Sequence, residues 1–204
     1  MKKTDRIRLG ITGGIGSGKS YICRILQERF GVPVYDCDKQ ARLLTLTQPE
    51  IQAQLETLIG GVCHEDGTID KAVLARYLFA SEENARRVNA IIHPAVRANL
   101  RNWYARQTVP VVAMESAILY ESGFETEVDK VLFVDAPFEL RLQRAMERDK
   151  ASREDILQRM NRQQSESQRL RADFRLTNDG NSNLEPLLAD LLQAINPINR
   201  ISNP

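Results

Sequence analysis

The segment from Gly13 to Ser20 constrains this chain more than any other stretch of its sequence. Four glycines fall within the six residues that end at Gly18, and a lysine and a serine follow directly. Upstream, apolar residues alternate with other types over residues 7–12, which predicts a short strand. Downstream, apolar residues recur at helical spacing over residues 22–30, which predicts a helix. The glycines therefore join a strand to a helix.

The same segment matches Gly-x-x-x-x-Gly-Lys-Ser in the strand–loop–helix context that this pattern requires. Glycine lets backbone N–H groups turn inward around an anion, and the start of the following helix adds partial positive charge. We therefore predict a phosphate-binding loop in which Lys19 reaches the β- and γ-phosphates of a nucleotide and the Ser20 hydroxyl binds Mg²⁺. The alternative is a flexible glycine turn before an amphipathic helix. A dinucleotide pattern, Gly-x-Gly-x-x-Gly, does not fit, because its last glycine would fall on Lys19.

Composition excludes several classes of protein. A net charge of +1 over 204 residues gives no bulk attraction to nucleic acid or membranes, and one tryptophan supplies no aromatic face for single strands. The sequence has no run of 18 apolar residues, and its charged first ten residues lack the apolar core of a signal peptide. Cys23, Cys37 and Cys63 match no zinc spacing and indicate free thiols in a reducing compartment. We therefore expect a cytoplasmic protein.

The pattern along the rest of the chain predicts a parallel α/β sheet. The candidate strands are residues 7–12, 33–36, 109–115, 130–135 and 173–178. Helical patterns separate most of them, as in chains that build βαβ units. From about residue 45 to residue 93, however, the pattern is helical without a strand. We therefore expect an inserted helical subdomain whose last helix is capped at Ser81 and ends near Pro94.

The segment from Phe138 to Arg175 has a composition of its own. It is rich in arginine, glutamate and glutamine and poor in large apolar residues. Within it, the stretch from Ser152 to Asp155 resembles a capping box at the start of a helix. This segment is either a solvated helical hairpin or a lid that closes over phosphates.

Acidic residues stand at the carboxyl ends of predicted strands, where the ligands of open α/β sheets collect. Asp36 and Asp38 end the second predicted strand, and Arg42 follows Asp38 by about one helical turn. If the chain stays extended through Cys37, the two carboxylates share one side. A carboxylate there can accept a proton from an attacking hydroxyl or hold Mg²⁺ through water. The alternative is a pair of exposed turn acids.

Two further predicted strands end in acids, at Glu115 and Asp135, and either acid is a candidate for work near the metal. The alternative for Asp135 is a helix cap. Arg141, Arg144 and Arg148 recur on one helical face. Guanidinium groups bind phosphate oxygens well, so this face is a candidate phosphate contact, although such a face is usually a solvated one.

Seven stretches, in order along the chain, resemble the dephospho-coenzyme A kinase family, a group of P-loop kinases similar to nucleoside-monophosphate kinases. They are LGITGGIGSGKS, VYDCDKQAR, DGTIDKAVLARYLF, IIHP, ILYESG, RAMERD and ADFRLTNDG. The resemblance covers nearly the whole chain, and the ordered set is far more specific than the phosphate loop alone.

This resemblance implies a fold and a reaction. The fold is an α/β P-loop NTPase core, a five-stranded parallel sheet with flanking helices, with an inserted helical CoA-binding subdomain and a helical lid. The implied segments are core 1–44, subdomain 45–94, core 95–137, lid 138–172 and core 173–204. The reaction is phosphoryl transfer from ATP to the ribose 3′-hydroxyl of dephospho-CoA, which gives CoA and ADP in the final step of CoA synthesis.

The resemblance also implies roles for individual residues. Asp38 resembles the base that faces the 3′-hydroxyl, with Asp36 beside the metal and substrate, and Lys19 and Arg144 complete the catalytic set. The ATP-binding residues implied are Gly13, Gly14, Gly16, Ser17, Gly18, Lys19, Ser20, Tyr21, Arg144, Arg148 and, at the adenine, Asn178. The substrate-binding residues implied are Asp36, Asp38, Arg42, His93 and Glu121, and Mg²⁺ is expected on Ser20, with Asp36 or Asp38 through water.

The chain departs from the family pattern at Tyr21, where threonine is usual, and at Glu115, where aspartate is usual. Two alternatives stay open: another small-molecule P-loop kinase, for nucleotides or sugars, and a regulatory module that binds ATP and turns over slowly. The aspartate pair and the arginine-rich segment favour an enzyme. We expect a monomer or a weak homo-oligomer that binds ATP, Mg²⁺ and dephospho-CoA but neither nucleic acid nor membranes.

Overall fold

The computed structural model describes residues 6–163 and 165–196, which form two compact units. The sheet unit contains the residues up to Asp36 and from Gln107 onward, and the helical unit contains Cys37–Arg106. The helical unit is longer at both ends than the expected subdomain of residues 45–94. It begins earlier because a helix follows the second strand without a loop, and it ends later because its last helix continues past Pro94.

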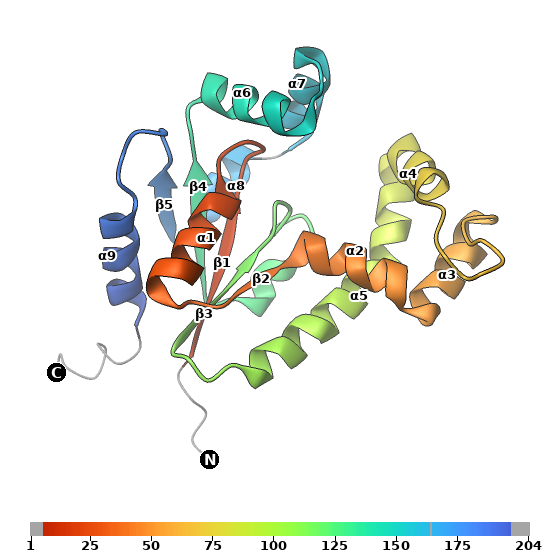
Figure 1. Ribbon diagram of the computed structural model, residues 1–204, viewed down its shortest axis with the longest axis horizontal. Helices are drawn as coiled ribbons and strands as arrows, with labels where there is room; N and C mark the ends of the chain where they lie inside the picture. The colour runs from red at the N-terminus through yellow and green to blue at the C-terminus, as the bar shows by residue number, and fades with distance from the viewer. Residues whose placement is uncertain (1–5, 164, 197–204) are drawn as a thin grey trace. The chain divides into compact units, whose positions relative to one another are not determined.

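The sheet unit is built on five parallel strands. They are β1 (Ile7–Gly13), β2 (Val34–Asp36), β3 (Val111–Glu115), β4 (Lys130–Asp135) and β5 (Phe174–Thr177). Their order is β2-β3-β1-β4-β5, and every neighbouring pair is parallel (Figure 1). All five predicted strands are confirmed, although β2, β3 and β5 are slightly shorter than predicted. The loop after β1, the central strand, lies at the carboxyl edge of the sheet, where ligands of such sheets bind.

Alternate residues of β1 serve the two faces of the sheet. On one face, Leu9 and Ile11 are fully buried in a core shared with α1 (Lys19–Phe30) and α9 (Glu185–Ile195). On the other face, Thr12 is also fully buried. A strand covered on both faces in this way is typical of parallel sheets, and it makes the start of the following loop rigid.

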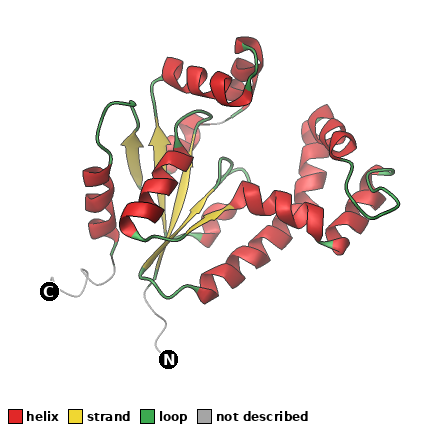
Figure 2. Ribbon diagram, in the orientation of Figure 1, coloured by secondary structure: helices red, strands yellow, loops and turns green. Residues whose placement is uncertain are grey.

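The arginine-rich segment forms three helices of the sheet unit, and the first two share a small core. These helices are α6 (Phe138–Asp149), α7 (Arg153–Arg162) and α8 (Ser165–Arg171), drawn in red in Figure 2, and the short 3₁₀ helix η1 (Phe124–Glu127) precedes them in the same unit. Leu142 of α6 packs in one apolar cluster with Ile156 and Met160 of α7. The Ser152 hydroxyl accepts the N–H of Asp155 at 3.2 Å, which confirms the predicted helix start.

The helical unit consists of four helices. They are α2 (Cys37–Thr47), α3 (Pro49–Ile59), α4 (Lys71–Ala80) and α5 (Glu82–Arg106), and α2, α3 and α4 all pack against α5. The turn after α3 is held by the Glu56 carboxylate, which accepts the N–H groups of Gly61, Val62 and Cys63 at 2.6–2.9 Å. These three charge-assisted hydrogen bonds hold the pKa of Glu56 below its ordinary value.

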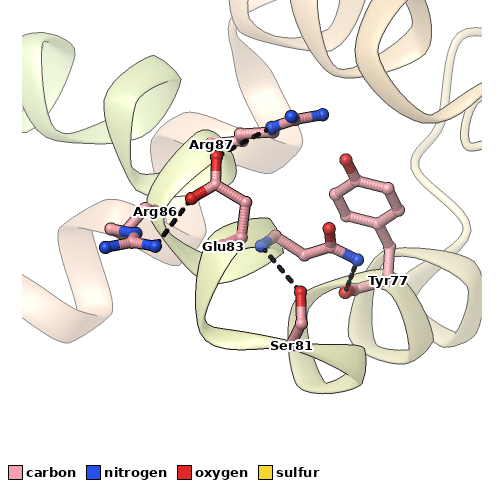
Figure 3. A network of polar contacts seen from close by, with 6 residues as sticks. Tyr77, Ser81, Glu83, Arg86 and Arg87 are labelled. Atoms are coloured by element: carbon pink, nitrogen blue, oxygen red, sulfur yellow. Dashed lines mark hydrogen bonds and ion pairs between the residues drawn. The ribbon is translucent and has the colours of Figure 1, made fainter.

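The turn between α4 and α5 carries the predicted helix start at Ser81. The Ser81 hydroxyl accepts the N–H of Asn84 at 3.1 Å, and the Asn84 side chain donates to the Tyr77 carbonyl at 3.0 Å (Figure 3). Within the first turns of α5, Glu83 forms ion pairs with Arg86 and Arg87. These pairs are exposed, so they stabilise the helix only slightly.

The predicted helix end near Pro94 is wrong, because α5 continues through Pro94 to Arg106. A proline inside a helix removes one backbone hydrogen bond and costs about 3 kcal/mol. The apolar stripe of α5 outweighs this cost, since Val88, Ile92 and Val96 are nearly or fully buried at helical spacing on both sides of the proline. Among the described residues no helix is long and apolar enough to cross a membrane.

Candidate active site

The loop between β1 and α1 has a shape that only glycine permits at two positions. Gly16 and Gly18 have φ angles of 76° and 89°, in the left-handed region. A Cβ atom on Gly16 would run into the Arg141 carbonyl, and one on Gly18 would run into the Asn178 side chain. The glycines of the motif are therefore needed both for the turn and for the close approach of α6 and of the chain after β5.

Several groups in and next to this loop could bind an anion. The Lys19 ammonium donates to the carbonyls of Gly13 at 2.9 Å and Gly14 at 3.2 Å, so it is folded back over the loop. Gly18, the N-cap residue, has no side chain that could accept the N–H groups at the start of α1. The Ser17 hydroxyl oxygen is buried without a hydrogen-bond partner among the described residues. The start of a helix, a nearby cation and a buried hydroxyl without a partner among the described residues fit a phosphate group.

Two of the three arginines predicted on one face of α6 contact the loop region. Arg141 donates to the Ile15 carbonyl at 3.0 Å, and Arg144 donates to the carbonyl of Asn178 at 3.3 Å. Asn178 is 4% exposed and donates from its side chain to the Ser17 carbonyl at 3.0 Å. Arg144 and Asn178, both predicted from the sequence as ATP contacts, thus lie near the loop, and the fold brings them there.

The third arginine of this face, Arg148, lies apart from the loop contacts. Its exposed guanidinium pairs with Asp149 at 2.7 Å, and Arg159 of α7 pairs with the same carboxylate at 2.6 Å. The two guanidinium groups hold the pKa of Asp149 at about 2. Arg148 is therefore part of an ion-pair group that joins α6 to α7.

Two acids meet at the carboxyl ends of β2 and β3, because Asp36 and Glu115 are partners in the register of these strands. The Ser20 hydroxyl donates to Glu115 at 3.2 Å, so the serine of the motif and this acid are in contact. Burial raises the pKa of the Glu115 carboxyl, the nearby Lys19 ammonium opposes this rise, and the Asp36 carboxylate adds to it. Hydroxyl and carboxylate oxygens are the protein ligands that Mg²⁺ prefers.

Two nearby residues complete the surroundings of these acids. Burial, together with the negative charge of Glu115, raises the pKa of the Cys23 thiol, which stays protonated and hydrogen-bonds to Glu115. On the other side of β1, Asp135 accepts the N–H of Ala136 and pairs with Arg169 at 3.7 Å. Asp135 is thus engaged in local contacts, whereas Glu115 faces the motif serine.

Three further predicted residues, Asp38, Arg42 and His93, lie in the helical unit. Asp38 does not continue the strand, because β2 ends at Asp36 and α2 begins at Cys37. The condition under which Asp36 and Asp38 would share one side, an extended chain through Cys37, is therefore not met. Asp38 and Arg42 are exposed on α2 of the helical unit. His93 is partly buried on α5, where burial and the charge of Arg97 lower its pKa.

Two glutamines near the loop were missed by sequence reasoning. Gln163 forms three hydrogen bonds with the loop and with Ala117. Gln168 is 1% exposed, accepts from the Thr12 hydroxyl at 3.0 Å and donates to the predicted substrate residue Glu121. A glutamine in a polar helical segment carries no pattern of its own, so no sequence signal pointed to either residue.

Among the described residues no cluster of three or more histidines, cysteines or acids could hold a metal ion. This observation does not conflict with the contact between Ser20 and Glu115, because Mg²⁺ in phosphoryl-transfer sites takes one or two protein ligands, several waters and the phosphates of the substrate. The residues present therefore fit Mg²⁺ bound together with a nucleotide.

Comparisons with known proteins point to one family. Residues 7–183 match the family model of dephospho-CoA kinase. The chain is 45% identical over 188 residues to the dephospho-CoA kinase of Bacteroides fragilis (strain YCH46), which covers 91% of each protein. It is 45% identical over 177 residues to that of Deinococcus radiodurans, covering 85% of this chain and 84% of the relative.

Solved structures extend the comparison to the fold. The protein TT1252 from Thermus thermophilus aligns with a TM-score of 0.80 at 34% identity, covering 93% of this chain and 98% of that one. Dephospho-CoA kinase from Campylobacter jejuni aligns with a TM-score of 0.64 at 25% identity, covering 94% and 98%. A shikimate kinase from Acinetobacter baumannii, at 18% identity and a TM-score of 0.55, shares the fold alone. The chain belongs to the dephospho-CoA kinase family.

Proposed function

We propose that this chain transfers the terminal phosphoryl group of ATP to the ribose 3′-hydroxyl of dephospho-CoA, giving CoA and ADP. The observation that carries the proposal is the family match over residues 7–183, together with relatives of the same name that are 45% identical over most of the chain. The contacts around the phosphate loop supply the physical basis.

Phosphoryl transfer needs positioning and charge neutralisation more than covalent chemistry. In our proposal, the N–H groups at the start of α1 bind the phosphates. The Lys19 ammonium, which now donates to Gly13 and Gly14, turns toward the β- and γ-phosphates. Arg144, which contacts Asn178 beside the loop, is the proposed residue that neutralises charge on the transferred group. Asn178 is also the proposed adenine contact.

The proposed metal ligand is the Ser20 hydroxyl, with Glu115 and Asp36 holding bound waters. The hydrogen bond between Ser20 and Glu115 and the adjacency of Asp36 and Glu115 support this set. Bound Mg²⁺ would neutralise charge on the phosphate oxygens. Burial raises the pKa of Glu115 and so disfavours its carboxylate form. A nearby cation, whether Lys19 or the metal, favours the carboxylate form.

We propose that α6 and α7 form a lid, with Arg144 and Arg148 as its ATP contacts. The helices share a small apolar core and a group of ion pairs, which lets them act as one piece. A lid of this kind excludes water, which would otherwise compete with the acceptor hydroxyl.

The acceptor is proposed to bind through Asp36, Asp38, Arg42, His93 and Glu121, with Asp38 as the base. The exposed positions of Asp38 and Arg42 on α2 leave both side chains accessible to a ligand. The free cysteines Cys23, Cys37 and Cys63 support a reducing, cytoplasmic compartment, and we propose a monomer or weak homo-oligomer, which size-exclusion chromatography would check.

The test is ADP release from ATP with a panel of acceptors, including dephospho-CoA, nucleoside monophosphates and sugars, at a series of Mg²⁺ concentrations. We expect dephospho-CoA to be preferred and activity to require Mg²⁺. A preference for a nucleotide or sugar would favour another P-loop kinase. ATP binding without turnover on any acceptor would favour a regulatory module.

The two aspartates are tested by Asp38→Asn and Asp36→Asn, which keep the size of the side chain but remove its charge. Losing a positioned general base costs about 10²–10⁴-fold in rate. We expect Asp38→Asn to lower kcat by roughly this factor with ATP binding nearly intact. Asp36→Asn should mainly weaken the Mg²⁺ response or the binding of dephospho-CoA. The opposite pattern would exchange the two roles.

A further inference from the structure

The side chain of Gln163, at the end of α7, makes three hydrogen bonds to main-chain atoms of other segments. Its Oε1 atom accepts the N–H of Ile15 at 2.8 Å. Its Nε2 atom donates to the carbonyl of Gly13 at 3.2 Å and to the carbonyl of Ala117 at 3.0 Å. One carboxamide thus joins the phosphate loop, the turn after β3 and the end of α7.

The chemistry of the partners determines how this carboxamide is oriented. Ile15 offers an N–H group and needs an oxygen, whereas Gly13 and Ala117 offer carbonyls and need N–H donors. The opposite orientation of the amide would lose all three hydrogen bonds. Glutamine supplies two N–H donors and one oxygen acceptor in this arrangement. A carboxylate of similar length has no N–H donor, and an apolar side chain has neither donor nor acceptor.

The Gly13 carbonyl is shared by Gln163 and Lys19. The Lys19 ammonium donates to it at 2.9 Å, and the Gln163 amide donates to it at 3.2 Å. Under the proposed function, Lys19 leaves this carbonyl when it turns toward the phosphates of ATP. Leaving a buried carbonyl without any donor costs free energy. Because the Gln163 amide still donates to the Gly13 carbonyl after Lys19 leaves, this cost is avoided.

We propose that Gln163 is a positioning residue for ATP binding: it keeps the Gly13 carbonyl satisfied when Lys19 moves to the phosphates, and it fixes the first half of the phosphate loop through Ile15. This inference rests on the proposed function, because it assumes that Lys19 binds a nucleotide phosphate. Gln163 itself touches no reacting atom.

A second glutamine makes a similar connection to β1 at Thr12, the residue before Gly13. Gln168 of α8 accepts from the Thr12 hydroxyl and donates to the Glu121 carboxylate. Both glutamines therefore link the end of β1 to the turn that follows β3. Gln163 differs because its partner at β1 is the same carbonyl that Lys19 uses.

The test compares Gln163→Ala and Gln163→Glu with Gln158→Ala, a matched control at an exposed position of the same helix. The dissociation constant for ATP is measured by calorimetry, kcat and KM by ADP release, and the exchange rate of the Ile15 amide by NMR. Gln163→Ala loses all three hydrogen bonds. Gln163→Glu keeps the acceptor for Ile15 but loses the donor to Gly13, so the two effects are separated.

We expect both Gln163 variants to bind ATP roughly 5- to 100-fold more weakly, as the loss of a donor to a buried acceptor implies, with KM for ATP rising more than kcat falls. Exchange of the Ile15 amide should accelerate in Gln163→Ala and stay slow in Gln163→Glu. Gln158→Ala should match the wild type in every measurement.

The inference is overturned if ATP affinity in the Gln163 variants stays within about twofold of that in Gln158→Ala, even if Tm falls, because Gln163 would then be a purely structural contact. If Gln163→Ala does not fold, the ATP affinity of Gln163→Glu decides in the same way. Failure of the proposed function looks different: the wild-type chain would bind ATP but would not phosphorylate dephospho-CoA.

Discussion

Replacing Asn178 by alanine should destabilise the protein measurably, because this side chain joins the chain after β5 to the phosphate loop. Asn178 is 4% exposed, and its side-chain amide donates to the Ser17 carbonyl at 3.0 Å. Its Oδ1 atom accepts from Arg144 at 3.4 Å, a distance at which a hydrogen bond is weak. The contact with Ser17 therefore dominates the expected loss.

The magnitude follows from these contacts. Leaving a buried acceptor without its donor costs about 1–3 kcal/mol, so we expect a loss of about 2 kcal/mol in the free energy of unfolding. For a chain of this size, each kcal/mol corresponds to about 2–4 °C in Tm. Asn178→Ala should therefore melt about 4–8 °C below the wild type.

The assay is differential scanning calorimetry with and without ATP. Asn181→Ala is the matched control, because Asn181 is exposed in the same loop. Its Tm should stay close to that of the wild type. If Asn178→Ala melted within about 1 °C of this control, the hydrogen bond to Ser17 would not stabilise the loop and the reasoning would be refuted.

Two further predictions follow from single side chains. Lys19→Ala should lower kcat by about 10²–10³-fold while circular dichroism stays unchanged, because one preorganised charge on the phosphates is lost; near-normal activity in the folded variant would exclude the phosphate-loop role. The pKa of Glu56 is lowered by three N–H groups, so the unfolded chain binds more protons than the folded one below the ordinary value of 4.5, and stability should fall there as pH falls. Glu56→Gln should flatten that dependence in urea titrations between about pH 3 and pH 6; equal slopes for both proteins would contradict the prediction.

Local sequence patterns determined much of this protein. The phosphate loop was predictable because Gly16 and Gly18 must adopt backbone angles that other residues avoid, and because the lysine and serine follow at a fixed spacing. The parallel sheet was predictable because alternating and helical periodicities are properties of short segments. The helix starts at Ser81 and Ser152 were predictable for the same reason, since a cap involves only residues three positions apart.

Other features were decided by tertiary structure, because local periodicity says nothing about contacts between distant residues. Pro94 looked like a helix end, yet the burial of Val88 and Ile92 carries α5 through it, because packing energy summed over a stripe exceeds a local backbone penalty. Asp36 and Asp38 looked like a pair on one strand, but the chain turns into a helix at Cys37.

The partners of the site residues were likewise decided by the fold. Glu115 meets Asp36 because the sheet order places β3 between β2 and β1, and this order is not a property of any one segment. Gln163 lies 150 residues from Gly13 in sequence, yet it donates to the same carbonyl as Lys19. A hydrogen bond of this kind depends on where two distant backbones meet, which only the packing of the whole sheet unit sets.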